Sequence, residues 1–516
     1  MKRYLLFTVF VSGMTTLAAE LAASRLIGNV FGTSNLVWAS IIGLILIYLT
    51  LGYFLGGRWA DRNPVPGAMY RVLAWGAFTL GLVPYFAGPV LRSAASAFEG
   101  LQVGILAGSF AAVLVLFIVP ITLLGTISPF AIRLSVDDPR SAGVTSGTIY
   151  AVSTLGSFLG TFLPTLVTIP AIGTKNTFLI FSLSLLFVAL AGLGKYASRR
   201  QMLIHLWMPI VLALTALGSA SQVLKSSQGQ VFETESAYNY IQVQVANGFT
   251  LLRLNEGQGI HSMYNPDTLH YGGPWELFLV GPYFNAGEQP QDVKRMAIVG
   301  LAAGTTARQA SAVYSGLPID GFEIDPEIVK VGREYFGMNL PNLNVHVEDG
   351  RLGLEQSTYL YDIIAVDAYR PPYIPPHMTT REFFQICASH LSENGVLTIN
   401  SASVPGDRRL IDGLATTMAS VFPSVHVMDI PGTLNTMIYA TRQPTTPENF
   451  AANLVALSQD PDTHPLLLTA MQTTFANLKP GYTTTSVFTD DRAPIEWIVN
   501  DMVIRFVLGG EVNILQ

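Results

Sequence analysis

The sequence predicts a multi-span α-helical membrane domain followed by an α/β domain with a doubly wound parallel sheet and a small N-terminal β subdomain. Half of the 516 residues are apolar and only 12% are charged, against about 25% in an ordinary soluble domain. Residues 1–222 hold 13 lysines and arginines against 5 acids, whereas residues 223–516 hold 16 against 30. A basic, lipid-embedded half and an acidic, water-soluble half explain this division most simply. We therefore expect a transmembrane domain at 1–222, a β-hairpin subdomain at 223–290 and the α/β domain at 291–516.

The membrane domain is predicted from runs of mostly apolar residues that reach about 20 residues, the length that crosses a bilayer. About seven such spans are expected, near residues 4–27, 34–57, 69–91, 101–124, 145–171, 176–194 and 203–220. Most lysines and arginines of the connecting loops fall on one side, which places the N-terminus in the cytoplasm by the positive-inside rule. Glu20 and Arg25 lie in or at the end of the first span, either as structural charges or as functional groups.

The composition also excludes several classes of site. Cys387 is the single cysteine, so neither a disulfide framework nor a cysteine-based zinc site is expected. The histidines show no metal-binding spacing, and we expect no metal. Because phosphates are bound by basic patches, the acidic soluble half argues against a nucleic-acid partner.

Short strands take the place of the long apolar runs from about residue 231. Apolar alternation over 231–245, then Asn247-Gly248 and a second alternating run over 249–254, predicts an antiparallel hairpin. Five further strands are expected at 295–299, 319–325, 345–350, 361–367 and 395–399. Helical segments separate them, and this alternation predicts a doubly wound parallel sheet.

Three of the predicted strands carry acidic residues at their ends: Glu323 with Asp325, then Asp349, then Asp367. Ligands of such sheets bind beyond the carboxyl ends of the strands. Glu323 is suited to both hydroxyls of a ribose and Asp349 to an adenine amino group. The loop after the first strand holds no lysine, so a nucleoside without phosphates, such as S-adenosylmethionine, fits better than a triphosphate.

Each of these residues also has a structural interpretation, which the sequence leaves open. Gly300 and Gly304, in the loop after the first strand, could serve only for close strand–helix packing. Asp325 precedes Pro326 and could cap a helix. Asp367 could anchor a loop through backbone amides.

Taken together, these segments resemble the spermidine synthases and, in layout, bacterial membrane proteins that fuse a transporter-like helical region to a spermidine-synthase-like domain. The motifs are Ser236-Ala237-Tyr238-Asn239-Tyr240-Ile241, the loop Gly300 to Thr305, Glu323-Ile324-Asp325, Glu348-Asp349-Gly350, and Val366-Asp367-Ala368-Tyr369-Arg370-Pro371. The segment Thr489-Asp490-Asp491-Arg492-Ala493-Pro494-Ile495-Glu496 resembles a closing motif of the fused members.

The resemblance implies a Rossmann-like catalytic domain, a homodimer and a multi-pass protein of the cell inner membrane. It also implies aminopropyl transfer to a small-molecule amine, with decarboxylated S-adenosylmethionine as donor and methylthioadenosine as product. Asn239 stands for a nucleoside-contacting glutamine, Asp349 and Gly350 for the adenine motif, and Asp367 for the residue that assists deprotonation of the amine.

Two departures from the family pattern bear on the substrate. Ala303 replaces an aspartate of the glycine loop, and Arg370 replaces the second aspartate of the motif that begins at Asp367. A cation repels a diamine but pairs well with a carboxylate. Ordinary S-adenosylmethionine, attacked or cyclised, is therefore an open alternative as donor. Tyr369 is a candidate wall residue and His261 a candidate second base.

Two other functions remain open. One is a methyltransferase that uses the same nucleoside, and the other is a transporter with a nucleoside-sensing domain. The topology is also open, because seven spans from a cytoplasmic N-terminus would place the catalytic domain outside, whereas a donor made in the cytoplasm requires it inside. We expect the cytoplasmic side.

Overall fold

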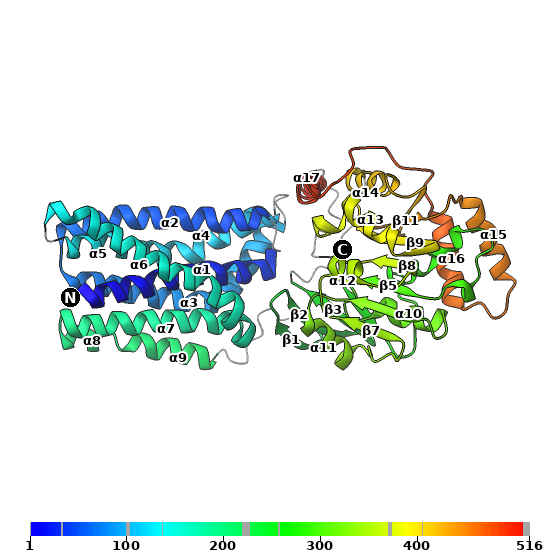
Figure 1. The fold of residues 1–516 in the computed structure, drawn as a ribbon. Coiled ribbons are helices and arrows are strands. Elements are labelled where there is room, and N and C mark those ends of the chain that lie inside the picture. The colour runs from blue at the N-terminus through cyan, green and yellow to red at the C-terminus, as the bar shows by residue number, and fades with distance from the viewer. Residues whose placement is uncertain are drawn as a thin grey trace. The chain divides into compact units, whose positions relative to one another are not determined.

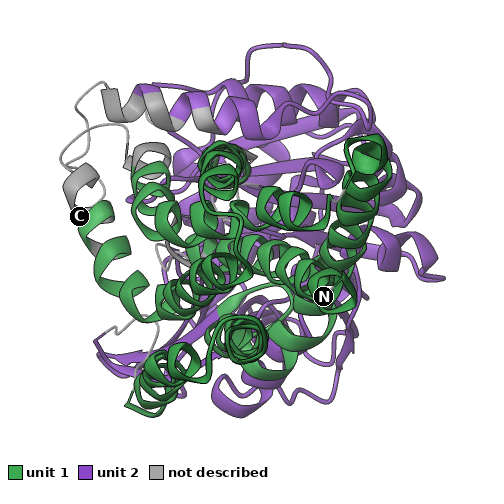
Figure 2. Cartoon of the chain, turned by 90° about the vertical axis from the view of Figure 1, so that its left-hand side faces the viewer, with its two compact units in different colours: residues 1–226, 235–240 green, residues 227–234, 241–516 purple. Residues whose placement is uncertain are grey.

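The computed structural model describes residues 2–31, 35–99, 104–136, 138–218, 228–255, 259–369, 374–404 and 406–508. It divides into two compact units, shown in different colours in Figure 2. The first comprises residues 1–226 and 235–240, and the second comprises residues 227–234 and 241–516. Each unit is described separately below.

The first unit is a helical bundle (Figure 1). Its helices are α1 (Lys2–Phe31), α2 (Asn35–Arg62), α3 (Pro66–Glu99), α4 (Gly104–Gly125), α5 (Ile127–Ser135), η1 (Pro139–Ser141), α6 (Ala142–Leu163), η2 (Pro164–Thr168), α7 (Ile169–Tyr196), α8 (Arg199–Ile204) and α9 (Trp207–Gly218). Six helical segments within the described residues are long and apolar enough to cross a membrane. The fifth, Pro139–Tyr196, has 58 residues and covers two of the seven predicted spans. The helical path breaks within it at Gly173, where φ is 78° and ψ is 168°.

Small residues allow α1 and α6 to pack at backbone distance. A Cβ added at Gly156 would lie 2.0 Å from the carbonyl oxygen of Phe10, and one at Gly160 would lie 2.0 Å from that of Met14. In lipid, where water does not drive helices together, such close packing is a main source of helix association. These two glycines therefore set the spacing of the α1–α6 pair.

Residues 235–240 belong to the helical unit through side-chain contacts. The Glu235 carboxylate accepts hydrogen bonds of 2.8 Å from both the backbone N–H and the hydroxyl of Thr174, next to the break at Gly173. Arg25 of α1 donates to the carbonyl oxygens of Ser236 and Tyr238. Arg25 thus binds backbone carbonyls of a segment that we expected within the β-hairpin subdomain.

A four-stranded antiparallel sheet has the order β1-β2-β3-β4. Its strands are β1 (Gln230–Glu235), β2 (Tyr240–Ala246), β3 (Phe249–Leu254) and β4 (Ser262–Tyr264). The predicted hairpin is present as β2 and β3, joined by Asn247 and Gly248, whose φ values are 51° and 81°. The predicted first strand is split into β1 and β2.

The remainder of the second unit is built on a seven-stranded sheet of order β10-β11-β9-β8-β5-β6-β7. Its strands are β5 (Met296–Val299), β6 (Ile319–Phe322), β7 (Leu343–His346), β8 (Tyr361–Val366), β9 (Leu391–Ala402), β10 (Ser424–Asp429) and β11 (Asn435–Thr441). Strands β5 to β9 pair in parallel, which confirms the doubly wound sheet, and β11 pairs antiparallel with both β9 and β10.

Helices cover both faces of this sheet (Figure 1). They are η3 (Trp275–Phe284), η4 (Pro290–Asp292), α10 (Thr305–Val313), α11 (Pro326–Tyr335), α12 (Gly350–Gln356), η5 (Pro376–Met378), α13 (Arg381–Ser389), α14 (Arg409–Ala419), α15 (Pro447–Ser458), α16 (Pro465–Asn477) and α17 (Ile495–Leu508). Side chains alternate along β5: Ala297 and Val299 join one core with α12–α14 and α17, while Met296 and Ile298 join the other with η3, α10, α15 and α16. Both faces are therefore buried, and ligand access is left to the carboxyl ends of the strands.

Candidate functional site

The glycine loop after β5 lies against the end of β8. Gly300 has φ of 89°, and a Cβ added there would lie 2.6 Å from the carbonyl oxygen of Asp367. Only glycine fits this combination of left-handed backbone and close approach. Gly304 has φ of 86°, and its added Cβ would lie 2.6 Å from Cγ of Met338. Gly300 thus brings the backbones of two strand ends together, whereas Gly304 is required by packing at the start of α10.

Glu323, directly after β6, faces the same loop. Its Oε2 accepts the backbone N–H of Ala302 at 2.9 Å, and its Oε1 accepts that of Asp325 at 3.0 Å. Burial raises the pKa of Glu323 to about 7, although these two N–H groups favour the charged form. A carboxylate oxygen has a further lone pair after one hydrogen bond. The Glu323 carboxylate, fixed by two backbone N–H groups, is therefore suited to accept hydrogen bonds from hydroxyl groups such as those of a ribose.

Asp325 is fully buried and caps a helix. Its Oδ1 accepts the backbone N–H of Glu327 at 3.0 Å in the first turn of α11. Asp325 therefore has the helix-capping role that was one of its two interpretations from the sequence. A nucleoside contact by Asp325 stays a prediction.

Asp349 lies between a helix start and a histidine. Its Oδ1 accepts the backbone N–H groups of Arg351 and Leu352 at 3.0 and 3.1 Å, which caps α12. Its Oδ2 lies 3.2 Å from Nε2 of His377. The hydrogen bond with His377 is the largest cause that lowers the pKa of Asp349. Gly350 is next to it, and a Cβ there would lie 2.5 Å from Cγ1 of Val299.

Asp367 follows the last residue of β8 and is partly exposed. Its Oδ1 accepts a hydrogen bond of 3.0 Å from the side-chain amide of Asn400, on β9. Burial raises the pKa of Asp367 to about 6, and the Asn400 bond opposes this shift. A carboxyl with a pKa near the working pH is suited to accept a proton from a reacting group.

The other predicted site residues are described here one by one. The Tyr369 hydroxyl accepts the backbone N–H of Ala402, so that it ties the chain after β8 to the end of β9. Arg370 lies outside the described residues. Burial lowers the pKa of His261 to about 4, and its Nε2 has no hydrogen-bond partner among the residues that the structure describes. Asn239 is in the segment 235–240 of the first unit. The predicted roles of these four residues stay predictions.

Two further side chains that contact the strand-end acids were not predicted from the sequence. Asn400 follows the apolar run 396–399, which is the same signal that points to Asp367 after Val366. His377 pairs with Asp349 across 28 positions of sequence, and no local pattern indicates that contact. Among the described residues no group of three histidines, cysteines or acids is arranged to hold a metal ion.

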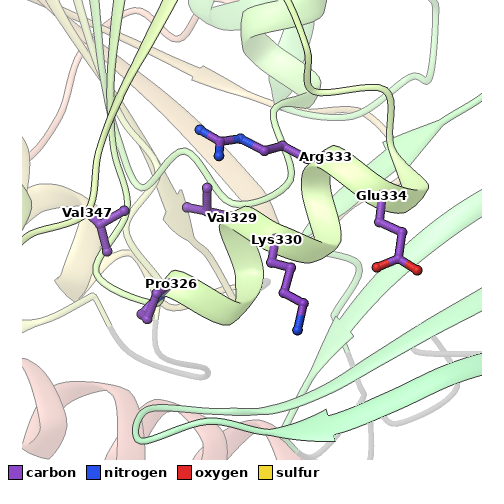
Figure 3. Close-up of a pocket in the computed structure, with 6 residues that line it drawn as sticks. All are labelled: Pro326, Val329, Lys330, Arg333, Glu334 and Val347. Atoms are coloured by element: carbon purple, nitrogen blue, oxygen red, sulfur yellow. The ribbon is translucent and has the colours of Figure 1, made fainter.

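A groove of about 530 Å³ runs along α11 (Figure 3). It is lined by Pro326, Val329, Lys330, Arg333, Glu334 and Val347. None of these is a predicted site residue, although Pro326 follows Asp325 and Val347 precedes the Glu348-Asp349 pair. The groove flanks the acidic strand ends without containing their carboxylates.

The fold and the carboxylates at its strand ends define an α/β domain of the class that includes methyltransferases and spermidine synthases. Residues 286–452 match the family described as the spermine/spermidine synthase domain. This similarity lies within the C-terminal half of the chain.

The relatives and the solved structure described next each cover about half of this chain. A probable polyamine aminopropyl transferase of Bifidobacterium longum is 30% identical over 51% of this chain and 61% of its own length. A polyamine aminopropyltransferase of Vibrio vulnificus is 29% identical over 43% of this chain and 75% of its own. The crystal structure of a probable spermidine synthase from Corynebacterium glutamicum shares 20% identity and covers 51% of this chain and 100% of its own, with a TM-score of 0.39. The chain thus spans somewhat under two thirds of the first relative's length.

Proposed function

We propose that this chain is a membrane-anchored transferase of the aminopropyltransferase type, which acts on decarboxylated S-adenosylmethionine or on S-adenosylmethionine itself. Asp367 carries the proposal. It is a carboxyl with a pKa of about 6, held by Asn400 at the tip of β8 and across the glycine loop from the buried Glu323. The names of the relatives support the same chemistry, since both are polyamine aminopropyl transferases.

The reaction is a displacement at the carbon next to the sulfonium. The amine nitrogen forms a bond to this carbon as the carbon–sulfur bond breaks, and the electron pair of that bond neutralises the sulfur. Methylthioadenosine leaves as a neutral thioether. The proton lost by the attacking nitrogen passes to the Asp367 carboxylate. Glu323 and Asp349 would orient the nucleoside, and positioning of the two reactants supplies a large part of the rate enhancement, about 7–11 kcal/mol in favourable cases.

The choice of donor depends on the residues that replace two aspartates of the family, one in the glycine loop and one in the motif that begins at Asp367. Ala303 is 1% exposed, and its backbone N–H donates to the Ser262 hydroxyl at 3.0 Å. It therefore offers no anion to an ammonium group. Arg370 stands in the place of another aspartate of the family. We therefore favour S-adenosylmethionine, whose carboxylate is intact, as the donor. It is either attacked by an amine or cyclised by attack of one of its own nucleophilic groups.

Three further parts of the proposal concern the setting of the enzyme. The long apolar helices anchor it in the cell inner membrane as a multi-pass protein, with lipid around the exposed apolar side chains. The catalytic domain lies in the cytoplasm, where the donor is made. The active form is a homodimer, as the resemblance to spermidine synthases implies.

Mass spectrometry of the products tests the proposed function directly. The full chain in detergent is incubated with each donor, with and without putrescine, and Asp367→Asn is compared with the surface control Asp462→Asn. We expect methylthioadenosine from the wild type and from Asp462→Asn, and a loss of at least about 100-fold in Asp367→Asn, the lower end of general-base effects. Adenosylhomocysteine without methylthioadenosine would instead identify a methyltransferase and overturn the proposal.

A further inference from the structure

The C-terminal segment 488–492 lies outside the residues that match the spermine/spermidine synthase domain, yet it is anchored in the second unit. Phe488 is 3% exposed, and its backbone N–H donates to the Thr417 hydroxyl at 2.9 Å. Thr489 and Arg492 exchange two backbone hydrogen bonds, of 3.1 and 2.9 Å. The resulting turn presents the Asp490 carboxylate from a fixed backbone.

Arg351 of α12 binds this carboxylate at two points. Its Nη1 and Nη2 donate to Oδ1 and Oδ2 of Asp490 at 2.8 and 2.7 Å. The Thr380 hydroxyl donates to Oδ1 at 2.7 Å. A two-point pair is the geometry in which a partly exposed ion pair has a measurable effect. The hydrogen bonds from Arg351 lower the pKa of Asp490 to about 2, so that the pair is fully charged at neutral pH.

The same guanidinium reaches the predicted adenine end of the site. Nη1 of Arg351 also donates to the backbone carbonyl of His377 at 2.8 Å. The ring of His377 in turn lies 3.2 Å from Oδ2 of Asp349, while the backbone N–H of Arg351 donates to Oδ1 of Asp349. Asp490 thus orients one arginine, and that arginine and His377 contact both carboxylate oxygens of Asp349.

A second set of contacts fixes the same stretch of chain. The backbone N–H of Asp490 donates to Oε2 of Glu382 at 3.0 Å, and the backbone N–H of Arg381 donates to the carbonyl of Phe488 at 2.9 Å. The start of α13 is therefore attached to the C-terminal turn through Thr380, Arg381 and Glu382. Residues 374–380 directly precede α13, so this attachment fixes the end of that segment.

We propose that Asp490 is a positioning residue: through Arg351 it holds residues 374–380 and His377 against Asp349, the carboxylate expected to accept the adenine amino group. The binding of adenine by Asp349 rests on the proposed function. The contacts from Asp490 through Arg351 and His377 to Asp349 do not depend on it. An ion pair that served stability alone would change only the unfolding temperature. A positioning residue changes the affinity for the nucleoside and the local order of residues 374–380.

The test compares Asp490→Asn with Asp491→Asn, because Asp491 is the exposed neighbour, and its side chain makes no hydrogen bond or ion pair among the described residues. Hydrogen–deuterium exchange of the full chain in detergent, without ligand, is expected to rise over 374–380 in Asp490→Asn only. Calorimetry with S-adenosylmethionine and methylthioadenosine is expected to show a Kd raised roughly fivefold in Asp490→Asn. The kcat at saturating donor is expected to stay unchanged, and Asp490→Glu is expected to recover most of the affinity.

Two results would overturn the inference. One is unchanged exchange over 374–380 in Asp490→Asn, and the other is equal nucleoside affinity in the two asparagine variants. If the wild type takes up neither nucleoside, the proposed function is wrong, and the exchange comparison still decides whether Asp490 holds residues 374–380.

Discussion

The side-chain amide of Asn400, on β9, donates a hydrogen bond of 3.0 Å to the carboxylate of Asp367 at the end of the neighbouring strand β8. Oδ1 of the same amide is buried and has no partner within the described part of the chain. A buried polar atom without a partner is costly unless a ligand satisfies it. Asn400 therefore holds the Asp367 carboxylate in place, and we expect its Oδ1 to accept a hydrogen bond from the amine of the proposed reaction.

Asn400→Ala should move the pH dependence of the reaction. The amide stabilises the ionised form of Asp367, so its loss raises a pKa that is already about 6. Under the proposed mechanism the ionised form is the active one, so the acidic limb of the kcat/KM profile should shift to higher pH. A profile from pH 5 to 9 measures this shift. An unmoved limb would show that Asp367 is not the group that titrates.

Gly300→Ala should abolish activity. The new Cβ would lie 2.6 Å from the Asp367 carbonyl oxygen, in a backbone with φ of 89°. The matched control is Gly316→Ala, where φ is 72° but no atom lies within 4 Å of the added Cβ. Both variants bear the left-handed strain of about 1–2 kcal/mol, and only Gly300→Ala also displaces the end of β8. Turnover assays should separate the two, and equal activities would contradict the close approach of these strand ends.

Glu323→Gln should lower stability by an amount that depends on pH. Burial raises the pKa of Glu323 to about 7 from an ordinary value of 4.5. The protonated form is thus favoured by folding, and the contribution of Glu323 to stability is complete below pH 4.5 and is lost as the pH rises to about 7. Glutamine does not titrate, so the gap in Tm between wild type and variant should narrow from pH 5 to pH 8. A constant gap in thermal unfolding scans would contradict the raised pKa.

Gly156→Ala should destabilise the helical unit, because its Cβ would lie 2.0 Å from the carbonyl oxygen of Phe10. Gly147→Ala on the same helix is the control, since no atom lies within 4 Å of its added Cβ. The control should be neutral or more stable by up to about 1 kcal/mol, the advantage of alanine over glycine in a helix. Thermal unfolding in detergent compares them. Similar stabilities would show that α1 and α6 do not pack at backbone distance.

The architecture was predictable because its signals are local and repeated. Apolar runs of bilayer length predicted the helices, and short strands between helices predicted the parallel sheet and placed the acids at its carboxyl edge. The predicted spans 145–171 and 176–194 lie on either side of Gly173, where the helical path of the segment Pro139–Tyr196 breaks. Strands β10 and β11 were not predicted, although Val425 and Val427 flank His426 in the alternation typical of a strand.

The site was predictable only in outline. Glu323, Asp349 and Asp367 follow apolar runs, and a strand end is visible in the sequence. The partners of these acids are not visible, because His377 and Asn400 reach them from 28 and 33 positions away. Asp490 belongs to the motif that begins at Thr489, but its contact with Arg351 spans 139 positions and depends on the tertiary fold.

Calorimetric titration of the full chain in detergent with S-adenosylmethionine and with its decarboxylated form tests the central claim most directly. The carboxylates of Glu323 and Asp349 are expected to give saturable binding of at least one of these sulfonium nucleosides, with loss of binding in Glu323→Ala. Absence of heat with both compounds, or equal binding by Glu323→Ala, would contradict the account.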